Sequence, residues 1–274
     1  MTANNIHARA AGAVARANRT DILTAEVANG VLYVTLNRPE RHNALSRATI
    51  AELAEVFALF AQDETLSVAV LTGAGDKSFA AGGDLKDLEA VRTEDDAAAM
   101  SRETRAAFDR IRTFPVPVVA ALNGTAVGGG AELACACDFR IAALRAKIGF
   151  VQSKMGLTTG WGGGLDLAAI VGSQAALRLT LTAEILDPSA ALAIGLYDAV
   201  AEEGALEAAV TIMTDRFRAL PRPVLASFKL LNRALRAGAD RAALETLETD
   251  MFARSWVGQP HWDAVAAFNA RRKT

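Results

Sequence analysis

The sequence is poor in cysteine. Only Cys135 and Cys137 occur among 274 residues, and two cysteines alone supply neither a disulfide framework nor a complete metal site. Side chains two positions apart on a helix point roughly 200° away from each other. We therefore expect both thiols to fill apolar space, in a reducing compartment.

Histidine and clustered basic residues are also scarce. The three histidines are His7, His42 and His261, and none stands beside a plausible nucleophile, which disfavours covalent acyl transfer by a Ser–His–Asp or Cys–His pair. We find no sequence cluster of metal ligands. A net charge of −2 disfavours nucleic acid as the main partner, because binding its phosphates requires clustered Lys and Arg.

Long apolar runs are missing as well. No run approaches the roughly 20 residues that cross a bilayer, and the N-terminus lacks a secretory apolar segment. We expect a cytoplasmic protein with no membrane partner. Residues 1–20 contain three arginines and no acidic residue. They are predicted to be a disordered tail, and a transit peptide is the alternative.

The remaining pattern predicts an α/β protein with a large core, since 51% of residues are hydrophobic. Apolar alternation around Asn29 and Gly30 predicts a hairpin, and Ser46 is placed to cap a helix that ends near Gln62. Short buried strands are expected at 67–73, 116–124, 139–143 and 146–150. Further helices are expected at 163–171, 173–182, 188–194, 204–219, 221–236, 240–257 and 260–272. Residues 21–200 then form the core and 201–274 a helical C-terminal section.

Two glycine clusters follow buried strands. They are "FAAGGD" (79–84) and "AVGGGAELACACD" (126–138), and each is predicted to precede a helix. Backbone N–H groups at such a helix start attract negative charge. A P-loop needs Gly-Lys-Ser/Thr, but Ala131, Glu132 and Leu133 follow the glycines here. The third glycine of a dinucleotide fingerprint is missing too.

A transient negative charge fits these glycines better than a resident phosphate. Glu132 would repel a bound phosphate, whereas N–H donors aimed at a carbonyl oxygen stabilise charge that develops only during a reaction. We therefore expect the amides of Gly83 and Gly129 to converge as an oxyanion hole. The alternative is that the glycines only permit tight helix–strand packing and that Glu132 is a solvated carboxylate.

The sequence resembles the enoyl-CoA hydratase/isomerase (crotonase) superfamily. The stretches that carry the resemblance are "VTLNRPERHNALS" (34–46), "SFAAGGDLKDL" (78–88), "ALNGTAVGGGAELACACDFRIA" (121–142), "GLTTGWGGG" (156–164) and "GSQAALRLTLTAEILDPSAALAIGLYDAV" (172–200). The resemblance implies a spiral of ββα units with a helical C-terminal trimerisation section. It also implies trimers, or trimers paired into hexamers, and an acyl-CoA thioester substrate. No cofactor is expected beyond the coenzyme A of the substrate.

The resemblance also assigns site residues. Gly83 and Gly129 match the oxyanion-hole glycines, and Glu132 matches the first catalytic glutamate of the hydratases. The positions that line the coenzyme A path match Arg41, Ala81, Asp84, Leu85 and Lys86. For Arg41 and Lys86 a solvated charge is the alternative.

One position departs from the hydratase pattern. Gln152 stands where hydratases have their second glutamate, and an amide neither takes up nor delivers a proton near neutral pH. The glycine-flanked Trp161 and the segments around it are similar to the ethylmalonyl-CoA decarboxylase subgroup. Trp161 either caps the acyl pocket or packs in the core. A decarboxylase of a short 2-carboxyacyl-CoA is therefore the leading hypothesis, ahead of a hydratase that uses Glu132 alone and of a CoA-binding scaffold with little catalysis.

Overall fold

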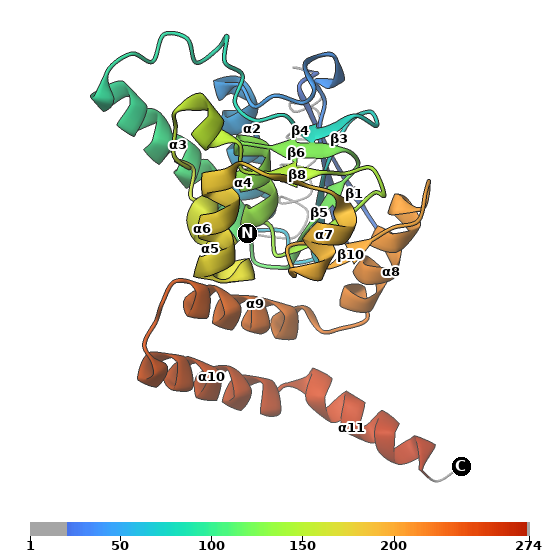
Figure 1. The fold of residues 1–274 in the computed structure, drawn as a ribbon. Coiled ribbons are helices and arrows are strands. Elements are labelled where there is room, and N and C mark those ends of the chain that lie inside the picture. The colour runs from blue at the N-terminus through green and yellow to red at the C-terminus, as the bar shows by residue number, and fades with distance from the viewer. Residues whose placement is uncertain (1–20, 273–274) are drawn as a thin grey trace.

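The computed structural model describes residues 21–272, in which two β-sheets are surrounded by helices (Figure 1). The six-stranded sheet has the order β1 (Leu23–Ala28), β2 (Val31–Leu36), β3 (Val68–Gly73), β5 (Val118–Leu122), β7 (Phe139–Ala142) and β10 (Ala199–Val200). The four-stranded sheet has the order β4 (Ser78–Ala80), β6 (Thr125–Val127), β8 (Ile148–Gly149) and β9 (Ile185–Leu186). The predicted tail, residues 1–20, lies outside the described residues.

A repeating strand–strand–helix unit builds both sheets. Each unit gives one strand to the large sheet and the next strand to the small one, as β3 and β4, β5 and β6, and β7 and β8 do. The helices that follow are α3 (Glu94–Arg112), α4 (Gly129–Ala136) and α5 (Gly163–Val171). Within each sheet these strands are parallel, as crossover connections require. The predicted ββα spiral is confirmed.

The first elements also follow the sequence pattern. β1 and β2 pair antiparallel with Ala28 opposite Val31, so Asn29 and Gly30 make the predicted two-residue turn, both with positive φ. The Oγ of Ser46 accepts a hydrogen bond of 3.1 Å from the N–H of Thr49 and caps α2 (Arg47–Phe60). The short 3₁₀ turn η1 (Pro39–Arg41) separates the hairpin from this helix.

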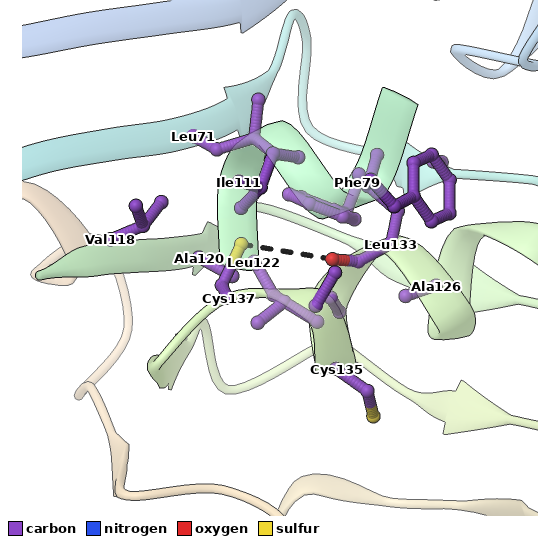
Figure 2. Packing of buried hydrophobic residues seen from close by; sticks show 14 of the residues in the cluster. Leu71, Phe79, Ile111, Val118, Ala120, Leu122, Ala126, Leu133, Cys135 and Cys137 are labelled. Carbon is purple, nitrogen blue, oxygen red and sulfur yellow. Dashed lines mark hydrogen bonds between the residues drawn. The ribbon is translucent and has the colours of Figure 1, made fainter. Parts of the chain in front are cut away.

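The hydrophobic core lies between the large sheet and the helices. Figure 2 shows Cys137 pointing toward Ile111 and Leu122, whereas Cys135 points to the opposite side of its helix, and both thiols belong to the buried cluster. Burial raises the pKa of each thiol to about 12, so both remain protonated. The prediction that the cysteines fill apolar space is confirmed.

The C-terminal section is helical, as predicted. It follows α6 (Ser173–Thr182) and α7 (Pro188–Ala193) and consists of α8 (Leu206–Arg218), α9 (Arg222–Arg236), α10 (Arg241–Trp256) and α11 (Gln259–Arg271). In Figure 1, α10 and α11 extend away from the sheets as an arm, and neither helix has a buried residue. The arm exposes Phe252, Trp256, Val257, Trp262 and Phe268.

One predicted helix does not form where we expected it. The segment after Gly83 makes a single turn, closed by the Leu88 N–H on the Asp84 carbonyl at 3.0 Å, and α3 begins only at Glu94. The intervening segment is polar and largely exposed, so it lacks the apolar face whose packing stabilises most helices. Thr93 instead caps α3 by accepting a hydrogen bond from the Asp96 N–H.

Within residues 21–272, no helix is long and apolar enough to cross a bilayer. This agrees with the absence of long apolar runs in the sequence. A cytoplasmic location stays a prediction.

Candidate active site

Strand pairing brings the two glycine loops together. β4 and β6 are parallel neighbours with Ala80 opposite Ala126, so the loops that follow them leave the sheet at the same edge. A methyl group placed on Gly82 would lie 3.4 Å from the backbone nitrogen of Gly129. Within the described residues, the N–H groups of Gly83 and Gly129 make no backbone hydrogen bond. Both amides remain available to an outside acceptor.

The second loop requires glycine for two separate reasons. Gly128 has φ of 55°, a conformation that side chains disfavour, and its carbonyl accepts hydrogen bonds from the N–H groups of Ala131 and Glu132. A Cβ on Gly130 would lie 1.9 Å from the carbonyl oxygen of Ala80. The start of α4 therefore packs directly on β4, so the expectation of close helix–strand packing is confirmed. Gly129 is itself buried, although its N–H has no backbone partner among the described residues.

Glu132 lies in the first turn of α4 and is almost fully buried. Its Oε2 accepts hydrogen bonds from the N–H groups of Trp161 (2.9 Å) and Gly163 (2.8 Å). Its Oε1 accepts one from Gln152 Nε2 (2.9 Å) and a longer one from the Gly160 N–H (3.5 Å). The alternative of a solvated surface carboxylate is wrong, because the side chain lies inside the protein at the N-terminus of α5.

The environment of Glu132 shifts its proton affinity. Burial raises the pKa of the Glu132 carboxyl, and the hydrogen bonds from Gly163, Trp161, Gln152 and Gly160 offset part of this rise. The net pKa stays above the usual value of a glutamate. A carboxyl whose pKa lies nearer to neutrality is suited to hold and deliver a proton.

Gln152, which the resemblance matched to the second glutamate of the hydratases, faces Glu132. It is the first residue of the 3₁₀ helix η2 (Gln152–Met155), and its Nε2 donates to the carboxylate. Within the described residues, its Oε1 is buried and has no hydrogen-bond partner. A buried acceptor of this kind is costly unless a donor from outside satisfies it.

Trp161 lies against both glycines. A methyl group on Gly129 would lie 2.0 Å from the indole Cζ3, and one on Gly83 would lie 3.1 Å from Cη2. The indole is buried and contacts Phe108 edge to face, with the ring centroids 5.9 Å apart. Trp161 is thus a packed residue and also a wall beside the two free amides.

The predicted coenzyme A residues divide into two groups. Asp84 is buried, and its Oδ2 lies 2.8 Å from Arg38 Nη2. This hydrogen bond lowers the pKa of Asp84, so the carboxylate is occupied by a partner within the chain. The side chains that remain exposed belong to Arg41, Ala81, Leu85 and Lys86.

Several contacts of the site were not identified from the sequence. Arg38 fixes Asp84, and the backbone of Gly160, Trp161 and Gly163 supplies three of the four hydrogen bonds to Glu132. The glycine-rich stretch 160–164 was the available signal for a close backbone approach. In the described part of the chain, no group of three or more His, Cys, Asp or Glu could hold a metal ion.

The family model for enoyl-CoA hydratase/isomerase matches residues 26–273. The chain belongs to this family. It is 41% identical to (E)-benzylidenesuccinyl-CoA hydratase of Thauera aromatica over 184 residues, which are 67% of this chain and 71% of the relative. It is 33% identical to ethylmalonyl-CoA decarboxylase of Gallus gallus over 241 residues, 86% of this chain and 80% of the relative.

Solved structures confirm the crotonase fold. The chain superimposes on an enoyl-CoA hydratase/carnithine racemase from Magnetospirillum magneticum with a TM-score of 0.85 and 32% identity. The match covers 92% of this chain and 93% of the other. The chain is therefore an acyl-CoA enzyme of the enoyl-CoA hydratase/isomerase family, whose members include both hydratases and a decarboxylase.

Proposed function

We propose that the enzyme decarboxylates a short 2-carboxyacyl-CoA thioester of the ethylmalonyl- or methylmalonyl-CoA type. Gln152 faces Glu132 at 2.9 Å where a second acid would be required for hydration, and this observation carries the proposal. Hydration takes one proton from water and delivers another to C2, whereas decarboxylation needs only one proton delivered. One titratable carboxyl beside a neutral amide meets the second requirement.

The reaction follows from the two loops. The bond between C2 and the carboxylate carbon breaks, CO₂ leaves, and the electron pair passes through C2 to the thioester oxygen as an enolate. The N–H groups of Gly83 and Gly129 stabilise that oxygen, since their charge-stabilising effect is greatest when the negative charge has developed. The carboxyl of Glu132 then protonates C2 and is reprotonated from water. Gln152 orients the departing carboxylate through its amide N–H.

The size of the acyl group is limited by Trp161. Its indole contacts both glycines and is braced by Phe108, so little space remains beside the amides for a long substituent. This supports a substrate with a short acyl chain. The charge of the proposed substrate is supported by the two relatives named above, because the acyl group in each of their names carries a free carboxylate.

The coenzyme A moiety is proposed to lie along Ala81, Leu85 and Lys86, with Arg41 near its phosphates. Asp84 borders this path, held by Arg38. The arm formed by α10 and α11, with its exposed aromatic side chains, supports assembly into a homotrimer or a dimer of trimers.

Hydration is the second candidate, and the buried Oε1 of Gln152 favours it. This acceptor has no partner among the described residues and is suited to hold a water molecule beside Glu132. The relative from Thauera aromatica is itself named a hydratase. In this reaction Glu132 alone would serve as base and then as acid.

Incubation with three substrates separates these functions. We expect the enzyme to release CO₂ from ethylmalonyl-CoA or methylmalonyl-CoA and to leave crotonyl-CoA unhydrated. Hydration of crotonyl-CoA without CO₂ release would replace the first proposal with the second, and inactivity towards all three would favour a CoA-binding scaffold. Gln152→Glu should create or raise hydratase activity, because it restores the second carboxyl.

A further inference from the structure

Three of the four hydrogen bonds to Glu132 come from the backbone of residues 160–163, so this loop must itself be held in place. Helix α3 holds it from outside through three side chains, one of which is Arg105, whose Nη2 donates to the carbonyl of Gly160 at 3.3 Å. Ser101 Oγ donates to the carbonyl of Gly160 at 2.5 Å, and Arg112 Nη2 donates to the carbonyl of Trp161 at 3.1 Å. The same peptide segment therefore contacts α3 with its carbonyls and Glu132 with its N–H groups.

The guanidinium of Arg112 packs directly against the 160–163 loop. A Cβ on Gly162 would lie 2.7 Å from its Nη2, and the arginine side chain is 15% exposed. Its guanidinium is also paired with Asp166 of α5, at 2.7 Å from Nη2 to Oδ2 and 2.9 Å from Nε to Oδ2. A planar guanidinium held at several points fixes the backbone it contacts more firmly than a point charge would.

A third helix extends this ion pair. Arg236 of α9 lies 2.9 Å from the other carboxylate oxygen of Asp166, and it also donates to the carbonyl of Cys135 in α4 at 3.3 Å. The carboxylate of Asp166 is 12% exposed and lies between two arginines. Because each charge here is largely removed from water, loss of one partner leaves the others unpaired.

We infer that Arg112, fixed by Asp166 and Arg236, is a positioning residue that aims the N–H groups of the 160–163 loop at the carboxyl of Glu132. Arg112 does not touch the proposed substrate. It acts through the backbone of Trp161. Arg112 binds the carbonyl of this residue, and the N–H of the same residue, in the preceding peptide unit, donates to Glu132 Oε2. The inference rests on the proposed function only in that Glu132 is taken to transfer the proton.

The test must distinguish a direct electrostatic effect of Asp166 on the pKa of Glu132 from an effect that acts through the position of the 160–163 loop. Behind the loop, one cavity is lined by charged groups, namely Arg105, Asp109 and Arg112 on α3, Asp138 after α4, Asp166 on α5, and Arg233 and Arg236 on α9. Cys135 on α4 is a titratable group that interacts electrostatically with Glu132. Neutralising Asp166 alone removes a negative charge, which lowers the pKa of a nearby carboxyl. Loosening the loop removes N–H donors from the ionised form, which raises that pKa. The two effects have opposite signs in Asp166→Asn.

The experiment uses full-length protein labelled with ¹⁵N-tryptophan, which gives three backbone amide signals for the three tryptophans of the chain. The Trp161 amide donates to Glu132, so its chemical shift reports the ionisation of that carboxyl without any substrate. Trp161→Phe identifies the signal. Glu132→Gln must abolish its titration, and a titration that survives this change overturns the inference.

Arg112→Lys keeps the positive charge and loses the planar guanidinium group with its several N–H donors. We expect its titration midpoint, like that of Asp166→Asn, to move to higher pH by half a unit or more, with a matching shift in the pH profile of kcat/KM. Arg102→Met, an exposed arginine on the same helix, is the matched control and should titrate as the wild type does. Thermal melting confirms that each variant is folded.

An unchanged midpoint in Arg112→Lys, a lower midpoint in Asp166→Asn, or a wild-type Trp161 amide that does not titrate overturns the inference. Failure of the proposed decarboxylation is a separate result. It would appear as inactivity towards ethylmalonyl-CoA and methylmalonyl-CoA while the titration midpoints still shift as expected.

Discussion

The two glycine loops come from equivalent positions in successive ββα units, yet they are built differently. The loop at 128–130 opens α4 at once and is fully buried, with Gly130 pressed on the carbonyl of Ala80. The loop at 82–83 continues into an isolated turn and exposed residues before α3 begins. Its anchor is a side-chain ion pair, Arg38 with Asp84.

This difference assigns a separate task to each loop. The buried loop carries Glu132 on the helix that follows it, so the proposed proton transfer would take place on a closely packed backbone. The other loop borders the proposed coenzyme A path, where side chains such as Leu85 remain exposed. Under the proposed function, the buried loop would position the proton-transferring group, and the partly exposed loop would contact coenzyme A.

The largest effect is expected for Gly130→Ala. A Cβ there would lie 1.9 Å from a backbone carbonyl, which forces α4 away from β4 and breaks the buried loop. We expect the melting temperature to fall by more than about 10 °C, or no folded protein at all. Gly160→Ala is the control, because its nearest new contact is an ordinary one at 3.7 Å. Equal melting temperatures for the two variants would show that Gly130 tolerates a methyl group as well as Gly160 does.

Glu132→Gln should abolish most turnover, by roughly 10²–10⁴-fold in kcat, while the protein stays folded. The pH dependence of stability gives a second readout. The pKa of Glu132 is raised in the folded state, so above about pH 4.5 the folded protein retains a proton that the unfolded chain releases. The wild type is therefore expected to lose stability relative to the variant as the pH rises above this value. Melting temperatures of both proteins at pH 4.5 and 8 test this sign. Retained turnover would remove Glu132 from the mechanism.

Alanine substitutions at Gly83 and Gly129 should show directly how the two loops differ in their tolerance of an added methyl group. At Gly129 the new Cβ would meet the ring of Trp161 at 2.0 Å, whereas at Gly83 it would meet the ends of two side chains at 2.9 and 3.1 Å. We expect kcat/KM to fall by about 10²-fold or more for Gly129→Ala and by about 10-fold for Gly83→Ala. Equal losses in steady-state kinetics would mean that both loops are equally rigid.

Arg38→Met should have the smallest effect. It leaves Asp84 without its ion-pair partner and is expected to cost about 1–2 kcal/mol of unfolding free energy, with Arg47→Met of the exposed α2 surface as control. The pKa of Asp84 is lowered in the folded state, so this stabilisation is present above about pH 4 and is lost as the pH falls through the folded value. Urea unfolding at pH 7 and pH 3 measures it. A difference from wild type that is equal at both pH values would contradict the ion-pair account.

Local patterns predicted most of the fold. The Asn29–Gly30 turn, the Ser46 cap and the buried strands depend on residues close in sequence, and the structure confirms each of them. The helix predicted after the first glycine cluster forms as α3, but its expected start is wrong. A glycine cluster marks where a helix is permitted and not whether an apolar face follows to stabilise it.

The candidate site was predicted in part. The contact between Glu132 and Gln152, 20 residues apart, came from matching a family pattern and not from spacing. The ion pairs of Arg112 and Arg236 with Asp166 join residues 54 and 70 positions apart. Such partners are selected by three-dimensional packing, and arginine and aspartate are common surface residues whose sequence positions give no sign of burial.

The three tryptophans report on different parts of the molecule. Trp161 is 7% exposed beside the glycine loops, whereas Trp256 and Trp262 on the arm are each 49% exposed. A soluble collisional quencher such as acrylamide should therefore quench the fluorescence of Trp256 and Trp262 first and that of Trp161 least. Fluorescence lifetimes of one unlabelled sample would then distinguish a ligand that binds beside Trp161 from an association that covers α10 and α11.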